Sequence, residues 1–148
     1  MLMPTKILVP TDFSEPSNRA LEQALDMAKQ YNAKVFLLHV LQRETHRTAM
    51  DFTIPEEMLE QFNNAALAWA QQSLQKQLDS FPQAREVEVA SNVRHGIAYE
   101  EILKEAKEQK ADLIVIASMG RSGIAKYLIG SAARNVLKGS KCPVLLTK

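Results

Sequence analysis

The stretch ADLIVIASMGRSGIAKYLIGSAARNV (Ala111–Val136) joins a continuous aliphatic run to a segment with helical spacing, and it holds three of the five glycines of the chain. An unbroken aliphatic run such as Ala111–Ser118 is typical of a strand that helices cover on both faces. Glycines after such a strand shape a turn, or they let another group approach the backbone closely. The stretch therefore predicts a central parallel strand, a loop of small residues and a helix.

Four further segments predict strands of the same sheet. Lys6–Pro10 and Lys34–Leu41 are aliphatic runs, whereas Arg85–Ser91 alternates glutamate with valine and so predicts an edge strand with one wet face. The last strand begins at Pro143, whose missing N–H suits the start of a strand near a sheet margin. The first and fourth strands are the most aliphatic and are therefore expected in the middle.

Helical spacing fills the intervals between these strands. The predicted helices run from Ser14 as N-cap to Asn32, from Pro55 to Pro82, from Ala98 to Lys110, and from Ser131 to Gly139. Five strands alternating with four helices indicate parallel units with right-handed crossovers. We expect the α/β class, with an open five-stranded parallel sheet in the order 3-2-1-4-5 and helices on both faces, a Rossmann-like arrangement.

Length and composition limit the classes of function. The 148 residues fit a single domain over residues 1–148. A formal charge of +1 is not the excess of positive charge that is typical of proteins binding nucleic acid or an anionic membrane. No apolar run approaches the roughly 20 residues that cross a bilayer. The start MLMPTK lacks the apolar core of a signal peptide, and a single cysteine, Cys142, forms no internal disulfide. We expect a cytoplasmic location.

The topology predicts a binding site where strands 1 and 4 end, because ligands bind at the carboxyl ends of parallel strands where neighbouring connections diverge. The segments at those ends are Pro10–Ser14 and Ser118–Gly123. A glycine-rich connection into a helix that starts at Gly130 and Ser131 suits a phosphate, to which Arg121 adds charge. Turn-forming glycines and an ordinary N-cap explain the same residues, so both interpretations stay open.

Four segments resemble the universal stress protein family of small α/β nucleotide-binding proteins. They are ILVPTDFSEPSNRALEQALDMA, VFLLHVL, HGIAYEEILKEAKEQKADLIVIASMGRSG and LIGSAARNVLKGSKCPVLLTK, and they cover nearly the whole chain except Gln42–Phe81. The nucleotide-binding branch of that family carries the motif G-x2-G-x9-G-[ST]. Its positions fall on Ala117, Gly120, Gly130 and Ser131, with the nine-residue gap intact and alanine in place of the first glycine.

The resemblance implies a site for ATP, or for ADP or AMP, with Mg²⁺ as an optional companion. The positions that it assigns to the base and the ribose are Pro10, Thr11, Asp12 and Val40. The positions that it assigns to the phosphates are Gly120, Gly130, Ser131 and the backbone of Ala132. Met119 stands where many relatives have histidine, and a methionine side chain can pack on a base ring.

Ala117 leaves two alternatives open. If the first motif position needs a positive φ, alanine costs about 1–2 kcal/mol and distorts the site; if residue 117 only ends the fourth strand, the methyl group fits.

Other conspicuous residues are assigned to structure. His39 is expected to be a hydrogen-bonded core or strand-end residue, and Trp69 to be part of the core. No histidine or cysteine pair has the spacing of metal ligands. The segment from Gln42 to Ile54 is long and without a pattern, which is typical of a lid or a mobile connection.

Three functions follow, in order of preference. The first is a cytoplasmic universal stress protein that binds ATP or a related adenine nucleotide and regulates an unidentified protein partner in the stress response. The resemblance also implies a homodimer through the C-terminal strand. The second is a nucleotide-independent dimeric interaction protein of the same fold, which Ala117 and Met119 favour. The third is an enzyme, of which we expect at most weak ATPase activity because no catalytic residues are visible.

Overall fold

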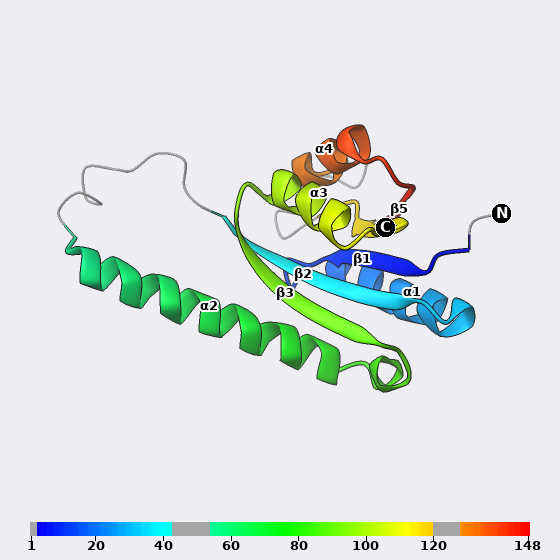
Figure 1. Cartoon of the computed structure of the whole chain (residues 1–148), viewed down its shortest axis with the longest axis horizontal. Helices are drawn as coiled ribbons and strands as arrows, with labels where there is room; N and C mark the ends of the chain where they lie inside the picture. Colours follow the sequence, from blue (N-terminus) through cyan, green and yellow to red (C-terminus); the bar gives the residue numbers. More distant parts are fainter. Residues whose placement is uncertain (1–2, 43–53, 120–127) are drawn as a thin grey trace.

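The computed structural model describes residues 3–42, 54–119 and 128–148. These residues form a five-stranded parallel sheet with helices on both faces (Figure 1). In chain order the elements are β1 (Lys6–Pro10), α1 (Glu15–Tyr31), β2 (Lys34–Gln42), α2 (Glu56–Asp79), the 3-10 helix η1 (Pro82–Glu86), β3 (Val89–Gly96), α3 (Ala98–Glu108), β4 (Leu113–Ala117), α4 (Ser131–Gly139) and β5 (Val144–Thr147).

The strand order is β3-β2-β1-β4-β5, which confirms the predicted topology. β1 lies in the centre, where Leu8 pairs with Phe36 of β2 on one side and Ile114 of β4 on the other. The continuous aliphatic runs of β1, β2 and β4 thus occupy the interior of the sheet, as expected of strands covered on both faces.

The core has two layers, one on each face of the sheet. On one face Ile7, Val9 and Leu37 pack with the buried side of α1 and with Leu74 of α2. On the other face Leu8 and its neighbours pack with Ile102 of α3 and with the apolar side of α4. Alternate residues of one strand face opposite layers, so each side chain buried in this way contributes about 1.5–3 kcal/mol to one of the two layers.

Helix α1 begins and ends where the sequence predicts. The side chain of Ser14 accepts a hydrogen bond from the backbone N–H of Ser17 (3.3 Å), which caps the first turn. Asn32 adopts the left-handed conformation (φ 54°) and its N–H donates to the carbonyl of Ala28, which closes the last turn. Helix α3 ends at Glu108 rather than at Lys110, because Lys110 itself turns to a left-handed φ of 54°.

The third strand differs from its prediction. The sheet strand is Val89–Gly96, whereas Pro82–Glu86, which includes the start of the alternating segment, forms η1. Pro82 fixes the φ angle that opens a helical turn, and Phe81 and Val87 pack against the first core layer from outside the sheet. The prediction that this strand lies at an edge is confirmed.

Helix α2 is less buried than its apolar stripe predicts. Its buried residues, Ala70, Leu74 and Gln77, all lie in its C-terminal half, while Phe62 and Trp69 are 58% and 47% exposed. A helix of 24 residues is about 36 Å long, and the eight residues of β3 span only about 26 Å. The N-terminal half of α2 therefore extends past the sheet (Figure 1).

Among the described residues, no helix is both long and apolar enough to span a membrane.

Candidate functional site

The loop after β1 is built around the buried side chain of Thr11. Its hydroxyl donates to Gln77 Oε1 of α2 (3.0 Å) and accepts from the backbone N–H of Phe13 (3.1 Å). Its own N–H donates to the carbonyl of Leu38 in β2 (2.8 Å). The side chain of Thr11 is thus committed to holding the loop, and Pro10 is buried at the end of β1. Of the predicted base and ribose residues in this loop, Asp12 is the one whose side chain is half-buried at its surface.

The carboxylate of Asp12 is held by the loop that follows it. Asp12 Oδ1 accepts hydrogen bonds from the N–H of Ser14 (3.0 Å) and from the Ser14 hydroxyl. Between the two residues, Phe13 has a φ of 65°, a left-handed conformation that residues other than glycine rarely adopt. The tight turn fixes the carboxylate next to the end of β1, where it is able to accept hydrogen bonds from hydroxyl or amino groups.

Val40 presents its backbone at the end of β1. The carbonyl of Leu38 points toward β1, since it accepts the N–H of Thr11. Two residues later along a strand the backbone groups point the same way again, so the N–H and C=O of Val40 point past Pro10, the last residue of β1. The Val40 side chain packs against the second core layer. Val40 therefore offers backbone groups, and not its side chain, to the carboxyl end of the sheet.

Three aromatic side chains line one flank of this loop. His39 Nδ1 donates to the carbonyl of Thr11 (2.8 Å), and its ring lies 4.5 Å from that of Phe13 between centroids. Trp69 of α2 meets the Phe13 ring edge-on at 5.4 Å. His39 is thus the hydrogen-bonded strand-end residue that the sequence predicts. The expectation that Trp69 is a core residue is wrong, because the indole covers the Phe13–His39 pair from outside and stays half-exposed.

Ala117 is the last residue of β4, where it pairs with Thr147 of β5. Among the described residues other than glycine, positive φ angles occur only at Phe13, Asn32 and Lys110. Ala117 is therefore in ordinary extended backbone. Of the two alternatives for this position, the strained one is wrong, and the methyl group fits at the end of the strand.

The chain returns to this strand end at Gly130. Ser118 donates its N–H to the carbonyl of Thr147 (2.8 Å), and the N–H of Gly130 donates to the carbonyl of Ser118 (2.7 Å). Met119, half-buried, follows Ser118. The hydrogen bond from residue 130 to residue 118 fixes the start of α4 directly at the carboxyl end of β4.

The local structure does not require a glycine at position 130. Its φ is −58°, which any residue adopts, and a Cβ placed on it would meet the carbonyl oxygen of Ser118 at 3.5 Å and the Cα of Met119 at 4.0 Å, ordinary contacts. No side chain caps the start of α4 in the described structure. The N–H groups of Ser131 and Ala132 thus lie at the positive end of the helix, in the turn whose N–H groups have no partner within the helix.

Some predicted site residues lie outside the described part of the chain. They are Gly120, Arg121 and most of the segment from Gln42 to Ile54. The residues that the structure brings to the carboxyl ends of β1, β2 and β4 are Pro10, Thr11, Asp12, Val40, Ala117, Met119, Gly130, Ser131 and Ala132. No group of three or more His, Cys, Asp or Glu residues able to hold a metal ion occurs in the described ranges.

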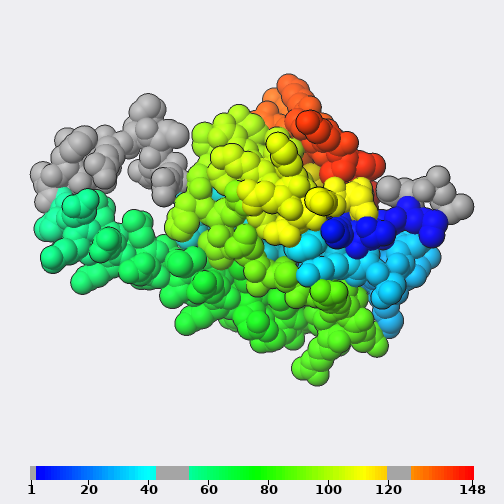
Figure 2. All heavy atoms as spheres, viewed as in Figure 1, coloured from blue at the N-terminus to red at the C-terminus, as the bar shows by residue number. Residues whose placement is uncertain are grey.

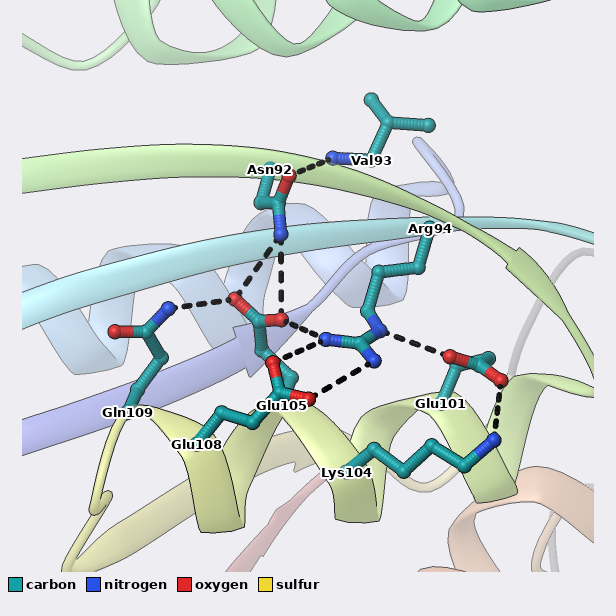
Figure 3. Close-up of polar contacts among 8 residues, drawn as sticks. All are labelled: Asn92, Val93, Arg94, Glu101, Lys104, Glu105, Glu108 and Gln109. Atoms are coloured by element: carbon teal, nitrogen blue, oxygen red, sulfur yellow. Dashed lines mark hydrogen bonds and ion pairs between the residues drawn. The ribbon is translucent and has the colours of Figure 1, made fainter.

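A charged cluster that the sequence did not reveal joins β3 to α3 (Figure 3). Arg94 forms ion pairs with Glu101 (2.8 Å), Glu105 (2.8 Å) and Glu108 (2.9 Å). Lys104 pairs with Glu101 (3.0 Å) on the same helix. Hydrogen bonds from the guanidinium of Arg94 lower the pKa of Glu101, with a further contribution from Lys104. The partners of Arg94 come from another element, which explains why local spacing did not predict them.

Comparisons with known proteins place the chain in a family. A family model described as the universal stress protein family matches residues 3–148. Universal stress protein MJ0531 of Methanocaldococcus jannaschii is 30% identical over 143 residues, which cover 97% of this chain and 81% of that protein. The solved structure of MJ0577, a universal stress protein of the same organism, is 30% identical and superposes with a TM-score of 0.83 over 99% of this chain and 97% of that chain.

A second solved structure is that of a universal stress protein in complex with cAMP. It is 26% identical to this chain and has a TM-score of 0.69, with 98% of this chain and 97% of that chain covered. The resemblance that the four sequence segments indicated is thus confirmed at the level of the family and of the fold.

Proposed function

The chain belongs to the universal stress protein family, and we propose that it is a regulatory member that binds an adenine nucleotide, ATP or a related one, at the carboxyl ends of β1, β2 and β4. The proposal depends most on Gly130, because neither its backbone conformation nor its surroundings require a glycine. A missing Cβ at the uncapped N-terminus of α4 leaves room for a phosphate to reach backbone N–H groups.

The other groups at these strand ends suit the rest of a nucleotide. The carboxylate of Asp12 is an acceptor that matches ribose hydroxyls or the adenine amino group, and the backbone of Val40 offers a donor and an acceptor to the base edge. Ala117, in relaxed extended backbone, imposes no strain on such a site. The complex of a similar universal stress protein with cAMP supports adenine as the base.

The test is a calorimetric titration of nucleotide-stripped protein with ATP, ADP, AMP and cAMP, with and without Mg²⁺. We expect saturable binding near one nucleotide per chain. Gly130→Ala should weaken binding by about tenfold or more, since the methyl group occupies the phosphate approach, a loss of roughly 1.4 kcal/mol. Its thermal unfolding midpoint should stay close to that of the wild type, because the added Cβ makes only ordinary contacts.

A matched variant separates backbone from side-chain recognition. Ser131→Ala removes one hydroxyl but keeps every N–H group, so it should weaken binding less than Gly130→Ala. Equal affinities for wild type and Gly130→Ala would contradict the phosphate site. Absence of binding to every nucleotide up to millimolar concentration would instead favour the second function, an interaction protein that works without a nucleotide.

Enzymatic turnover is the least supported function. The described part of the site holds one carboxylate, Asp12, and no pair of carboxylates or histidine–nucleophile pair. We therefore propose at most weak ATPase activity, measurable as phosphate release over many binding cycles. A cytoplasmic location and a single functional domain over residues 1–148 stay predictions, to be checked by fractionation and by limited proteolysis.

We also propose that two copies of the chain form a homodimer through β5, as the resemblance to the family implies. In the described sheet β5 is an edge strand whose one neighbour is β4, and Leu145 in it is 36% exposed. An edge strand leaves one row of backbone groups without a sheet partner, which a second copy is able to pair.

A further inference from the structure

A concave surface lies at the opposite end of the sheet from the proposed nucleotide site. It is a groove of about 470 Å³ between α3, the turn into β4 and the segment that joins α4 to β5. The nucleotide site lies at the carboxyl ends of the strands, whereas this groove lies at their amino ends, near Ala111 before β4 and Cys142 before β5. In Figure 2 the atoms of α3 (yellow) and those after α4 (red) lie next to each other on one face.

The floor of the groove is apolar. Leu103, Ala106, Ala111 and Cys142 line it, and all four pack against the second core layer. The Ser140 hydroxyl and the backbone of Cys142 satisfy each other, because the hydroxyl donates to the carbonyl of Cys142 (2.7 Å) and accepts from its N–H (3.2 Å). The floor therefore offers contact surface for an apolar group and few polar atoms that need a partner.

The close packing of α3 and α4 fixes the shape of the floor. A Cβ on Gly139 would lie 2.6 Å from Leu103 Cδ1, so with any other residue at position 139 the end of the Leu103 side chain would have to shift. Any larger residue would have to push Leu103 away, and Leu103 is itself part of the lining. The groove is thus a consequence of how two helices meet, and not of a loose surface side chain.

The rim of the groove carries one sign of charge. Lys104, Lys107, Lys110 and Lys141 line it, and none of the other described lining residues is acidic. Lys104 pairs with Glu101, whereas Lys107, Lys110 and Lys141 make no ion pair in the described structure. The C-terminal ends of α3 and α4 face this region with about half a negative charge each. Three unpaired cations exceed that charge, so the groove retains a positive surplus.

We propose that this groove binds a small anionic amphiphile, a molecule with an aliphatic chain and one carboxylate. The chain would cover the apolar floor, and the carboxylate would lie among the lysine ammonium groups. The volume falls within the range of small-molecule sites, about 300–1,000 Å³, in which apolar walls supply contact and a few polar groups supply orientation. The site goes beyond the proposed nucleotide binding and does not depend on it, because the two sites share no residue.

Cys142 gives a direct readout, since it is the sole cysteine of the chain and lines the floor. The rate of its alkylation by N-ethylmaleimide, an uncharged reagent, is measured with increasing decanoate below the micellar concentration. A ligand that covers the thiol slows the reaction by the factor one plus the ratio of its concentration to its Kd, so about five times the Kd should slow it roughly sixfold. Bound decanoate should also raise the thermal unfolding midpoint, whereas a denaturing detergent effect would lower it.

Comparison compounds divide the proposal into its two parts. Decanol has the same chain without the charge, and acetate has the charge without the chain; both should protect Cys142 much less than decanoate at equal concentration. Equal protection by decanol would overturn the role of the lysine rim. Equal protection by acetate would overturn the role of the apolar floor, and no protection by decanoate would overturn the site as a whole.

Charge-reversal variants provide the second arm of the test. In the triple variant K107E/K110E/K141E the protection by decanoate should disappear, while in the control Lys138→Glu, a lysine on α4 that does not line the groove, it should persist. Protection is the ratio of the alkylation rate without decanoate to the rate with decanoate, measured for the same variant. A changed intrinsic reactivity of Cys142 therefore does not affect it. Nucleotide binding should be unchanged in all of these variants. If the triple variant unfolds, the wild-type comparison of decanoate with decanol still decides the proposal.

Discussion

At Gly96, backbone conformation and packing both disfavour a side chain. Its φ is 149°, which side chains other than hydrogen disfavour, and a Cβ on it would lie 2.8 Å from Glu101 Oε1 and 2.9 Å from Glu101 Cγ. Glu101 is unable to move away freely, because Arg94 and Lys104 hold its carboxylate. Gly96→Ala should therefore lower the free energy of unfolding by about 1–3 kcal/mol, measured by urea denaturation.

A second glycine provides the control for that prediction. Gly130→Ala adds the same methyl group at a position with ordinary φ and ordinary contacts, so its free energy of unfolding should change by less than about 0.5 kcal/mol. The two variants thus separate a glycine that the fold requires from one that it tolerates changing. Equal stabilities of both variants would show that the Glu101 side chain is able to move away, and that the charged cluster of Arg94 holds it less firmly than the distances indicate.

At the scale of elements, Arg94 joins the edge strand β3 to α3, and this contact should depend on pH. Hydrogen bonds from Arg94 lower the pKa values of Glu101 and Glu108 below those of the free side chains. A carboxylate with a lowered folded-state pKa contributes stability that is present above its unfolded pKa, about 4.3, and is lost as pH falls through the folded value. The free energy of unfolding should therefore decrease between about pH 5 and pH 2.

The variant Arg94→Gln tests the source of that dependence. It removes the cation but keeps a hydrogen-bond donor, so the loss of stability below pH 5 should become shallower than in the wild type. Part of the acid dependence should remain, because Asp112 keeps a lowered pKa: burial raises it, but hydrogen bonds from Thr5 and from the N–H of Lys6 lower it further. Identical pH profiles for the two proteins would contradict the assignment to Arg94.

The two halves of α2 should differ in their contribution to stability. Leu74 is 1% exposed and lies in the first core layer, whereas Phe62 is 58% exposed on the half that extends past the sheet. Leu74→Ala should cost about 2–4 kcal/mol through lost burial and a cavity, and Phe62→Ala less than about 0.5 kcal/mol. Chemical denaturation of both variants measures the difference, and a large cost at Phe62 would show that this half of α2 packs against another part of the protein.

Sequence patterns predicted the elements that depend on local signals and missed those that depend on distant contacts. The caps Ser14 and Asn32 and the aliphatic central strands were recognisable, because each signal lies within the element itself. The alternation in Arg85–Ser91 was misleading, since Glu86 and Glu88 pair with Lys29 and Lys34 of other elements instead of forming the wet face of a strand. The exposure of Trp69 depends on the length of α2 relative to the sheet, which no local pattern contains.

At the candidate site the same distinction holds. The strand order predicted that the site lies where β1 and β4 end and the connections diverge, and it predicted that Asp12 and Gly130 lie there. The sequence left open whether Ala117 is strained, because that depended on whether residue 117 stays in the extended backbone of β4, where it pairs with Thr147 of β5. The groove between α3 and α4 was not predicted, because its lysines look like ordinary solvent-exposed residues until the fold places them around one apolar floor.

At the scale of the whole molecule, the two edges of the sheet are protected differently. β3 carries Arg94, which forms ion pairs with α3, and it contacts the long α2, whereas β5 is short and exposes Leu145. Unprotected edges invite pairing with another strand, and proteins commonly block it with charged side chains. The asymmetry predicts that any sheet-to-sheet association between two copies uses β5.

That association should be sensitive to a single charge on the edge. We expect the wild type to sediment as a dimer at micromolar concentration and Leu145→Lys to sediment as a monomer, because the variant would bury an unpaired ammonium between the two β5 strands. The matched control is Ile97→Lys, a comparably exposed residue (41%) between β3 and α3 at the other edge, which should stay dimeric. A dimer that persists in Leu145→Lys but dissociates in Ile97→Lys would show that the interface lies at the β3 edge. The charged cluster of Arg94 would then be part of that interface.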